Sequence, residues 1–289
     1  MTEPPRRDEA DAIGLTEADY ERFCEFFYGK TGITLDENRR YFVRSRLGRR
    51  MRATGYDSFR GYFGFVRTDT DEGELQQLVN EMTVNETYFY REDHQFDCLV
   101  RHILPEISAR RAGRPIKIWS VPCSTGEEPY SVALHLLEDW RGLAQHDVTI
   151  LASDIDTSVL AAARKGVYSP RSVGNLPATV LSRYFEPLRT GDFRLSADLR
   201  DAVEFVKMNL LDTPLRLQQG DVDVVFCRNL LIYFDRRAQR QAVENIAEAL
   251  RPGGFVLLGH SESMSRISDL FLVRRFPQGI VYQKPLESP

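Results

Sequence analysis

The chain has 289 residues, 42% of them hydrophobic, and a formal net charge of −4 at neutral pH. This length suits one large domain plus a small one, and the apolar content excludes wholesale disorder. The negative net charge excludes a protein whose whole surface binds nucleic acid nonspecifically. The cysteines have no metal-ligand spacing, the amino terminus lacks a secretion-signal core, and no apolar run approaches the ~18 residues of a membrane span. A cytoplasmic protein without a structural metal or membrane insertion is predicted.

The amino-terminal part is predicted to be helical. Residues 1–14 are expected to form a flexible tail, and residues 15–80 a small all-α domain of short helices. Thr16 with Asp19 three positions later is typical of a capping box, which starts a helix. Residues 81–115 are predicted to be a linker and a connecting helix.

One predicted helix of this domain, residues 37–54, is strongly basic, with seven arginines and one acid. Four of the arginines share one side of a helical wheel: Arg39, Arg46, Arg49 and Arg50. Charge runs are usually solvated faces, but such faces normally mix signs. The excess therefore predicts an anionic partner, either an acidic helix surface or nucleic acid.

From residue 116 to residue 289, apolar strands alternate with helical segments, which predicts a Rossmann-like α/β domain. Residues 169–200 interrupt this alternation with turn residues and a two-sided segment, and they are predicted to be an inserted antiparallel β-subdomain. Residues 280–284 are expected to be the last strand and to close the sheet as an edge.

The segment 116–131 ends its strand in a polar turn at Gly126, followed by Glu127 and Glu128, and the next strand ends in Asp154. In open α/β sheets such a unit binds a nucleoside: backbone near the glycine approaches the ligand, and the acid binds the ribose hydroxyls. Two glutamates disfavour a phosphate and favour a cationic or zwitterionic nucleoside such as S-adenosylmethionine (SAM). Alternatively, Asp154 is a helix N-cap, and one glutamate complements the helix dipole while the other faces the ligand.

Two further segments could carry chemistry. In residues 85–92, Arg91 could bind a carboxylate through its planar guanidinium, or the whole segment could be a linker that packs two domains together. Tyr233 follows the apolar strand 222–227 and could present its hydroxyl at the carboxyl end of a central strand, although a buried tyrosine is the commoner outcome.

Six motifs, in order along the chain, resemble the CheR family of bacterial SAM-dependent methyltransferases, which esterify glutamates of chemoreceptors. They are NETYFYR (85–91), WSVPCSTGEEPYS (119–131), ASDID (152–156), NLL (209–211), FCRNLLIYFD (226–235) and GHSES (259–263). The resemblance implies a small helical domain, a linker, and a class I methyltransferase sheet with a small antiparallel subdomain. It also implies SAM as the cofactor, S-adenosylhomocysteine as the product, and the cytoplasmic helical domain of membrane chemoreceptors as the partner.

The resemblance further implies roles for single residues. Arg91 and Tyr233 match the residues nearest the transferred methyl, and the basic helix would face the receptor's methylation helix. The implied cofactor contacts are Asn85, Thr87, Arg91, Glu128 (with Glu127 as the second candidate), Asp154, Asn209, Leu210, Arg228 and Asn229.

The hairpin 187–199 departs from part of the family. Members that dock onto a carboxy-terminal receptor pentapeptide carry a longer, glycine-richer loop, whereas residues 188–193 contain only Gly191. Independence from that tether is predicted.

Two other functions are weighed. A nucleic-acid methyltransferase would explain the arginines, but the Asn/Asp-Pro-Pro-aromatic tetrapeptide typical after the fourth strand is absent. A non-catalytic SAM-binding signalling module would not need both Arg91 and Tyr233.

Overall fold

The computed structural model describes residues 14–286 except 112, 213–214 and 216. The predicted tail, residues 1–14, lies outside the described residues apart from Gly14. The chain divides into two compact units. The helical unit comprises Met1–Val84 and Tyr233–Asp235, and the sheet unit comprises Asn85–Ile232 and Arg236–Pro289. Among the helices of the described residues, none combines the length and the apolar character that crossing a bilayer requires.

The helical unit begins with the predicted capping box. The Thr16 hydroxyl accepts the Asp19 backbone N–H (3.2 Å), and the Asp19 carboxylate accepts the Thr16 N–H (3.4 Å). This exchange satisfies donors that a helix start leaves unpaired. The elements that follow are α2 (Glu17–Thr31), η1 (Glu37–Arg39), α3 (Arg40–Thr54), α4 (Phe59–Thr68) and α5 (Gly73–Met82).

An aromatic cluster fills the core of the helical unit. Phe23 and Phe27, one turn apart on α2, are fully buried. The Phe23 ring lies 6.3 Å from Phe59 and 6.2 Å from Phe63 of α4, both edge to face. Burying large rings in such pairs gives a small helical unit much of its packing energy.

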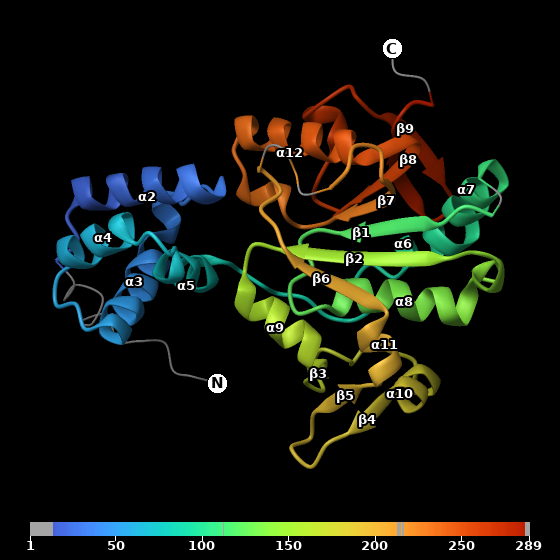
Figure 1. The fold of residues 1–289 in the computed structure, drawn as a ribbon, viewed down its shortest axis with the longest axis horizontal. Helices are drawn as coiled ribbons and strands as arrows, with labels where there is room; N and C mark the ends of the chain where they lie inside the picture. The colour runs from blue at the N-terminus through green and yellow to red at the C-terminus, as the bar shows by residue number, and fades with distance from the viewer. Residues whose placement is uncertain (1–13, 112, 213–214, 216, 287–289) are drawn as a thin grey trace. The chain divides into compact units, whose positions relative to one another are not determined.

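The sheet unit contains a seven-stranded sheet in the order β6-β2-β1-β7-β8-β10-β9 (Figure 1). The first five strands in this order are parallel, and β10 is antiparallel to both neighbours. The strands are β1 (Ile116–Ser120), β2 (Val148–Asp154), β6 (Val203–Lys207), β7 (Val222–Cys227), β8 (Leu250–Leu258), β9 (Leu272–Phe276) and β10 (Gly279–Gln283).

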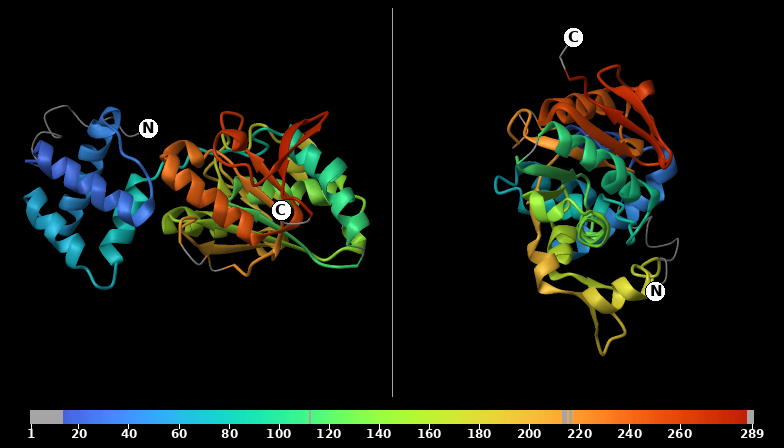
Figure 2. Two further views of the ribbon diagram at one scale, coloured as in Figure 1. Left: turned by 90° about the horizontal axis from the view of Figure 1, so that it is seen from above. Right: turned by 90° about the vertical axis from the view of Figure 1, so that its right-hand side faces the viewer.

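Helices on both faces cover the parallel strands, so most residues of these strands are apolar. Figure 2 shows the two helical layers from further directions. The helices of the sheet unit are α6 (His94–Cys98), α7 (Leu104–Arg110), α8 (Glu127–Asp139), α9 (Thr157–Lys165), α10 (Ala178–Tyr184), α11 (Ala197–Asp201) and α12 (Arg236–Ala249). The Rossmann-like fold predicted for this part of the chain is confirmed.

The expected place of the last strand is wrong. β10 lies inside the sheet, between β8 and β9, and β9 is the edge. After β8, the chain first forms β9 at the edge and leaves a gap of one strand. It then turns at Pro277 and Gln278, and β10 fills the gap, antiparallel to both β8 and β9. The two arginines in β9, Arg274 and Arg275, hide its strand character in the sequence.

The predicted antiparallel insertion is a separate three-stranded sheet in the order β3-β5-β4. It contains β3 (Val167–Tyr168), β4 (Phe185–Pro187) and β5 (Phe193–Leu195), with α10 between the first two. A short loop joins β4 to β5, closed where the Leu188 N–H donates to the Asp192 carbonyl (2.8 Å).

Gly126 ends the turn between β1 and α8 with a φ of 95°. A Cβ there would lie 2.9 Å from the Tyr130 ring, 3.0 Å from Ala163 Cβ and 3.1 Å from the Tyr168 hydroxyl oxygen. Protein atoms therefore fill the side of the glycine on which a side chain would project. Glycine is required here for its conformation and for the close packing of α8 and α9 against the turn.

We expect Gly126→Ala to lower the free energy of unfolding by more than about 2 kcal/mol, because left-handed backbone strain adds to steric overlap. Gly191→Ala is the matched control: Gly191 has a φ of 90° but no atom within 4 Å of an added Cβ. It should lose only the backbone contribution of ~1–2 kcal/mol. Urea unfolding of both variants measures the difference, and equal losses would contradict the packing argument.

Candidate functional site

The predicted site residues of the sheet unit gather at the carboxyl edge of the parallel strands. Glu127 and Glu128 begin α8 after β1, Asp154 ends β2, and Arg228 and Asn229 follow β7. β1 and β7 are neighbours, and the chain order reverses between them. Open α/β sheets bind ligands at such a switch point.

Asp154 is buried, 3% exposed, and does not cap a helix. Its carboxylate accepts the backbone N–H groups of Ser124 (2.8 Å) and Asp156 (3.0 Å). Asp156 is the N-cap of α9, accepting from Ser158 N (2.8 Å), so the capping alternative for Asp154 is wrong. Burial raises the pKa of Asp154 to about 6, although these backbone bonds oppose the rise.

The start of the linker is tied to the tip of β2. The Asn85 side-chain amide donates to the Asp156 carboxylate (2.8 Å), and the Ser124 hydroxyl donates to the Asn85 carbonyl (3.2 Å). Thr87 follows two residues later and is partly exposed. Asn85 and Asp154 are thereby held around the same turn, as a shared ligand would require.

Glu127 and Glu128 have different surroundings. Glu127 accepts from the hydroxyls of Thr125 (2.6 Å) and Ser172 (2.8 Å). Glu128 accepts from the Ser120 hydroxyl (2.7 Å) and pairs with Arg228 (3.2 Å). Burial raises the pKa of both carboxyls; hydroxyl donors oppose this at Glu127, and Arg228 opposes it at Glu128.

Arg228 is a buried cation, 4% exposed, at the end of β7. Its guanidinium pairs with Glu128 (3.2 Å) and Glu92 (3.6 Å), and it donates to the Arg91 carbonyl. The group also lies 5.5 Å from the centre of the Phe96 ring. One side chain therefore connects the β1–α8 turn, the linker and the tip of β7.

Asn229 has a φ of 58°, a left-handed conformation that asparagine tolerates. Its N–H donates to Glu262 (2.8 Å), whose carboxylate also accepts the N–H groups of Leu231 (2.8 Å) and Gly259 (2.9 Å). Burial raises the pKa of Glu262, although these backbone donors favour its charged form. Glu262 thus fixes the loop after β7 to the tip of β8.

Arg91 lies between two left-handed residues, Tyr90 and Glu92, each with a φ of 57°. Such conformations cost on the order of 1–3 kcal/mol each and persist only where the surroundings fix them. The Arg91 guanidinium donates to the Glu86 carbonyl (3.0 Å) and lies 5.7 Å from the centre of the Tyr88 ring.

The segment after β6 is tied to the same edge. The Met208 N–H donates to the Asp154 carbonyl (3.0 Å). The Asn209 side chain accepts the Leu211 N–H (3.1 Å), and Leu210 is buried, its carbonyl accepting from Asn245 (2.7 Å). Asn209 and Leu210 therefore follow the strand beside Asp154, where the resemblance places adenine contacts.

The predicted partner of Arg91, Tyr233, belongs to the other unit. The segment Tyr233–Asp235 packs with the helical unit. There the Arg39 guanidinium lies 4.9 Å from the centre of the Tyr233 ring, and the Thr34 N–H donates to the Tyr233 carbonyl (3.0 Å). The role of Tyr233 near the transferred methyl stays a prediction.

The arginines of α3 are less available than their number suggests. Arg46 and Arg49 both pair with Glu81 of α5 (3.3 and 3.2 Å). Arg50 pairs with Glu74 through two contacts of 2.9 and 2.6 Å, and Glu74 also accepts the buried Tyr62 hydroxyl (2.7 Å). The Arg50 side chain is 17% exposed and that of Arg49 47%. Carboxylates distant in sequence neutralise part of the basic face.

Sequence reasoning assigned no function to Glu92 or Glu262. Glu92 directly follows Arg91, and Glu262 lies in the GHSES motif. The sequence did contain one indication: each of these acids lies in or next to a motif, outside any predicted helix whose exposed face would account for it.

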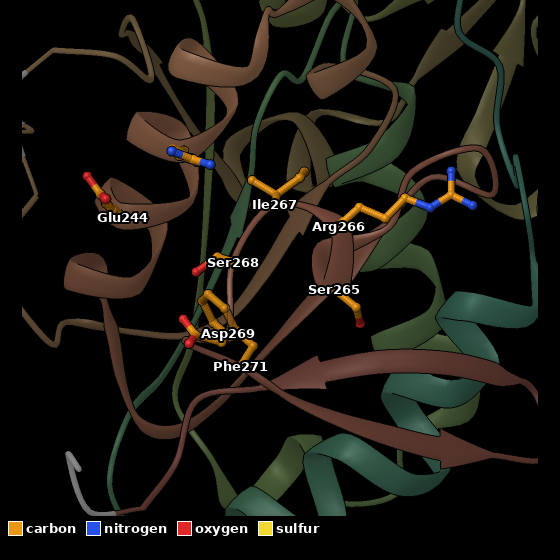
Figure 3. Close-up of a pocket in the computed structure, with 8 residues that line it drawn as sticks. Glu244, Ser265, Arg266, Ile267, Ser268, Asp269 and Phe271 are labelled. Atoms are coloured by element: carbon orange, nitrogen blue, oxygen red, sulfur yellow. The ribbon is translucent and has the colours of Figure 1, made fainter.

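A pocket of about 600 Å³ lies elsewhere in the sheet unit, between α12 and the segment before β9 (Figure 3). Its lining includes none of the predicted site residues and carries charges of both signs. The lining residues are Arg240, Glu244, Ser265, Arg266, Ile267, Ser268, Asp269 and Phe271. The strand-end carboxylates, not this pocket, form the candidate cofactor site.

We expect Arg228→Met to lower the free energy of unfolding by about 3–5 kcal/mol, because it removes the buried cation that the largely buried carboxylates Glu92 and Glu128 share. The control is Arg171→Met, whose pair with Glu86 is exposed (87% and 71%). That change should cost less than about 1 kcal/mol. Chemical denaturation compares the variants, and similar stabilities would show that Arg228 is not the required counter-ion.

Comparison with known proteins identifies the family. A model described as "CheR methyltransferase, all-alpha domain" matches residues 18–83, and "CheR methyltransferase, SAM binding domain" matches residues 85–280. The chain is 50% identical over 273 residues to "Chemotaxis protein methyltransferase 2" of Vibrio cholerae, covering 94% of this chain and 95% of that one.

Two further relatives have similar coverage. "Chemotaxis protein methyltransferase 2" of Pseudomonas aeruginosa is 40% identical over 262 residues, covering 88% of this chain and 90% of its own. "Chemotaxis protein methyltransferase" of Salmonella typhimurium is 37% identical over 265 residues, covering 91% and 89%. With both family models and these relatives spanning most of its length, the chain belongs to the CheR family and is a SAM-dependent methyltransferase.

Proposed function

We propose that this enzyme transfers the methyl group of SAM to glutamate side chains in the cytoplasmic helical domain of bacterial chemoreceptors. The products are glutamate methyl esters that serve sensory adaptation. The observation that carries the proposal is the carboxylate-rich strand edge around Asp154, in a chain whose relatives are named chemotaxis methyltransferases over nearly their full length.

The residues at this edge fit SAM by charge. Asp154, Glu127 and Glu128 are acidic, and Arg228 is already paired with Glu128 and Glu92. This composition suits a cation better than a phosphate. In addition, the Arg228 Nε is buried without a hydrogen-bond partner among the described residues, and a carboxylate of the cofactor would satisfy it. Asp154 would accept the ribose hydroxyls, and Asn85, Thr87, Asn209, Leu210 and Asn229 would complete the site.

Bound SAM supplies a methyl group on a positively charged sulfur. A substrate glutamate, with a pKa of about 4.3, is already ionised at neutral pH and needs no general base. The protein's task is then alignment, which can supply up to ~7–11 kcal/mol of the barrier. Arg91 would orient a carboxylate, and the Tyr233 hydroxyl would form a hydrogen bond near the reacting centre.

Receptor recognition is assigned to the basic face of residues 37–54, which consists of Arg39 at the end of η1 and Arg46, Arg49 and Arg50 of α3. A methylation helix rich in glutamate would complement it. The pairs with Glu74 and Glu81 leave this face less positive than nucleic-acid binding would favour. This difference supports a protein substrate over the nucleic-acid alternative.

Incubation with SAM labelled in its methyl group should transfer label to a receptor cytoplasmic fragment, and mild base should release it as methanol. Arg91→Ala should lose at least ~100-fold in turnover with an unchanged unfolding midpoint, because alignment is lost and not packing. Arg171→Ala is the surface control. Base-stable label, label on nucleic acid, or no transfer would each contradict the proposal.

Pentapeptide independence is tested with the same assay. The β4–β5 loop is short and closed by its own Leu188–Asp192 bond, so it offers little flexible backbone for a tethered peptide. Fragments with and without a terminal pentapeptide should be methylated at equal rates. A rate or affinity that drops on deletion would refute this part alone.

Affinity for S-adenosylhomocysteine should fall as pH falls below about 6. The pKa of Asp154 is raised to about 6 by burial, so its carboxylate, the form that accepts ribose hydroxyls, is lost below that pH. The dissociation constant should rise about tenfold for each pH unit below 6. In the cofactor-free protein the effect on stability has the opposite direction. Because the pKa of Asp154 is higher in the folded than in the unfolded protein, the folded protein binds this proton first, and the stability should rise as pH falls from about 6 to about 4. Calorimetry on wild type and Asp154→Asn checks this; an identical pH dependence in both would exclude Asp154 as the source.

A further inference from the structure

The conformation of the Arg91 segment requires support from outside it. Tyr90 and Glu92, on either side of Arg91, are both left-handed and neither is glycine. On the amino side, the Tyr90 N–H donates to the buried Ser131 hydroxyl (3.1 Å), and the Tyr90 ring lies 4.5 Å from that of His135. These contacts fix the segment to α8.

On the carboxyl side, the support is the side chain of Glu92, which is 12% exposed. Its Oε2 accepts from the Gln95 amide (2.8 Å), and its Oε1 is 2.9 Å from Nδ1 of His260. The Arg228 guanidinium lies 3.6 Å away. Burial opposes the charge of Glu92, but Arg228 and His260 outweigh it and hold the pKa of this carboxyl below its ordinary value.

The three partners of Glu92 belong to different parts of the fold. Arg228 follows β7 and also donates to the Arg91 carbonyl. His260 follows β8, and Gln95 of α6 also donates to the Leu258 carbonyl at the end of β8 (2.8 Å). The Glu92 carboxylate therefore fixes the linker to the tips of two central strands, immediately beside Arg91.

We propose that Glu92 is a positioning residue for Arg91, with His260 as its partner on β8. Glu92 holds the left-handed turn that aims Arg91, and it acts on methyl transfer only through that residue. This inference rests on the proposed function in one respect, the assignment of Arg91 to the transfer site. It also gives His260, the histidine of the GHSES motif, a positioning task through its contact with Glu92.

Glu92→Gln keeps the size of the side chain but places an amide among groups that donate hydrogen bonds. At saturating SAM, we expect the rate of methyl transfer to a receptor fragment to fall by ~10–100-fold, since small misplacements of an aligning group have effects of this size. In the cofactor-free protein, amide hydrogen exchange at residues 90–93 should accelerate by at least about tenfold.

Glu106→Gln is the matched control. Glu106 also lies in a clamp of donors, from Arg274 (2.9 Å), Arg110 (3.4 Å) and Gln283 (3.3 Å), and its pKa is likewise lowered, with those donors outweighing the effect of burial. These donors come from α7, β9 and β10, and differ from the groups that hold Glu92. Its loss should leave the transfer rate and the exchange at residues 90–93 unchanged, even if global stability falls.

His260→Asn provides a second variant should Glu92→Gln fold poorly, because His260 is 72% exposed and its replacement disturbs no core. It should shift rate and exchange in the same direction by a smaller factor. If both variants keep wild-type rate and wild-type exchange, the proposal is overturned.

A double-mutant cycle tests whether Glu92 acts through Arg91. Glu92→Gln should add no further loss of rate in an Arg91→Ala background, because the residue it positions is gone. Losses that multiply would overturn the proposal. An Arg91→Ala enzyme with normal turnover would instead refute Arg91's role in the proposed function, and hydrogen exchange at residues 90–93 would then decide the positioning role without any turnover.

Discussion

Burying a charged guanidinium carries a large desolvation penalty unless carboxylates lie beside it and offset that penalty. Arg228 meets this condition with Glu128 from the start of α8 and Glu92 from the linker. Removing either carboxylate would leave the buried guanidinium only partly compensated, and removing both would leave an unpaired buried charge, which is strongly destabilising. Three chain segments distant in sequence are therefore obliged to meet at one point. That point is the switch point of the sheet, where the order of strands reverses.

Backbone strain is concentrated around this meeting point. Among the described non-glycine residues with positive φ, four lie at the carboxyl edge of the sheet: Tyr90, Glu92, Ser124 and Asn229. Each has a stabilising contact, such as the bond from the Ser124 N–H to Asp154 or from the Asn229 N–H to Glu262. Backbone strain that persists at one edge, where side-chain contacts hold each strained residue, is typical of a pre-organised binding site.

The sequence predicts the sheet well because strands buried on both faces are apolar runs, as in β7, and because Asp154 directly ends such a run. β9 is missed for a physical reason. Arg274 is held by Glu106 of α7, a partner 168 positions away, and no local pattern reveals that a charged residue can lie in a strand there. The basic helix is over-interpreted for the same reason, since Glu74 and Glu81 neutralise it from another helix. Arg228 and His260 beside Glu92, and the Asn229 and Leu231 N–H groups beside Glu262, are brought near only by the fold, so the roles of these two acids could not be read from spacing.

The place of β10 has a consequence for the sequence of events in folding. β9 precedes β10 in the chain, yet among the described strands β9 pairs with β10, and β10 lies between β9 and β8. Until the hairpin is complete, β8 presents an unsatisfied row of amide and carbonyl groups, and β9 has nowhere to attach. If the parallel strands assemble earlier, β8 is an exposed edge strand until β10 is in place, and an exposed edge strand can pair with another chain. Pairing of β10 with β8 therefore removes an open strand edge from the middle of the sheet.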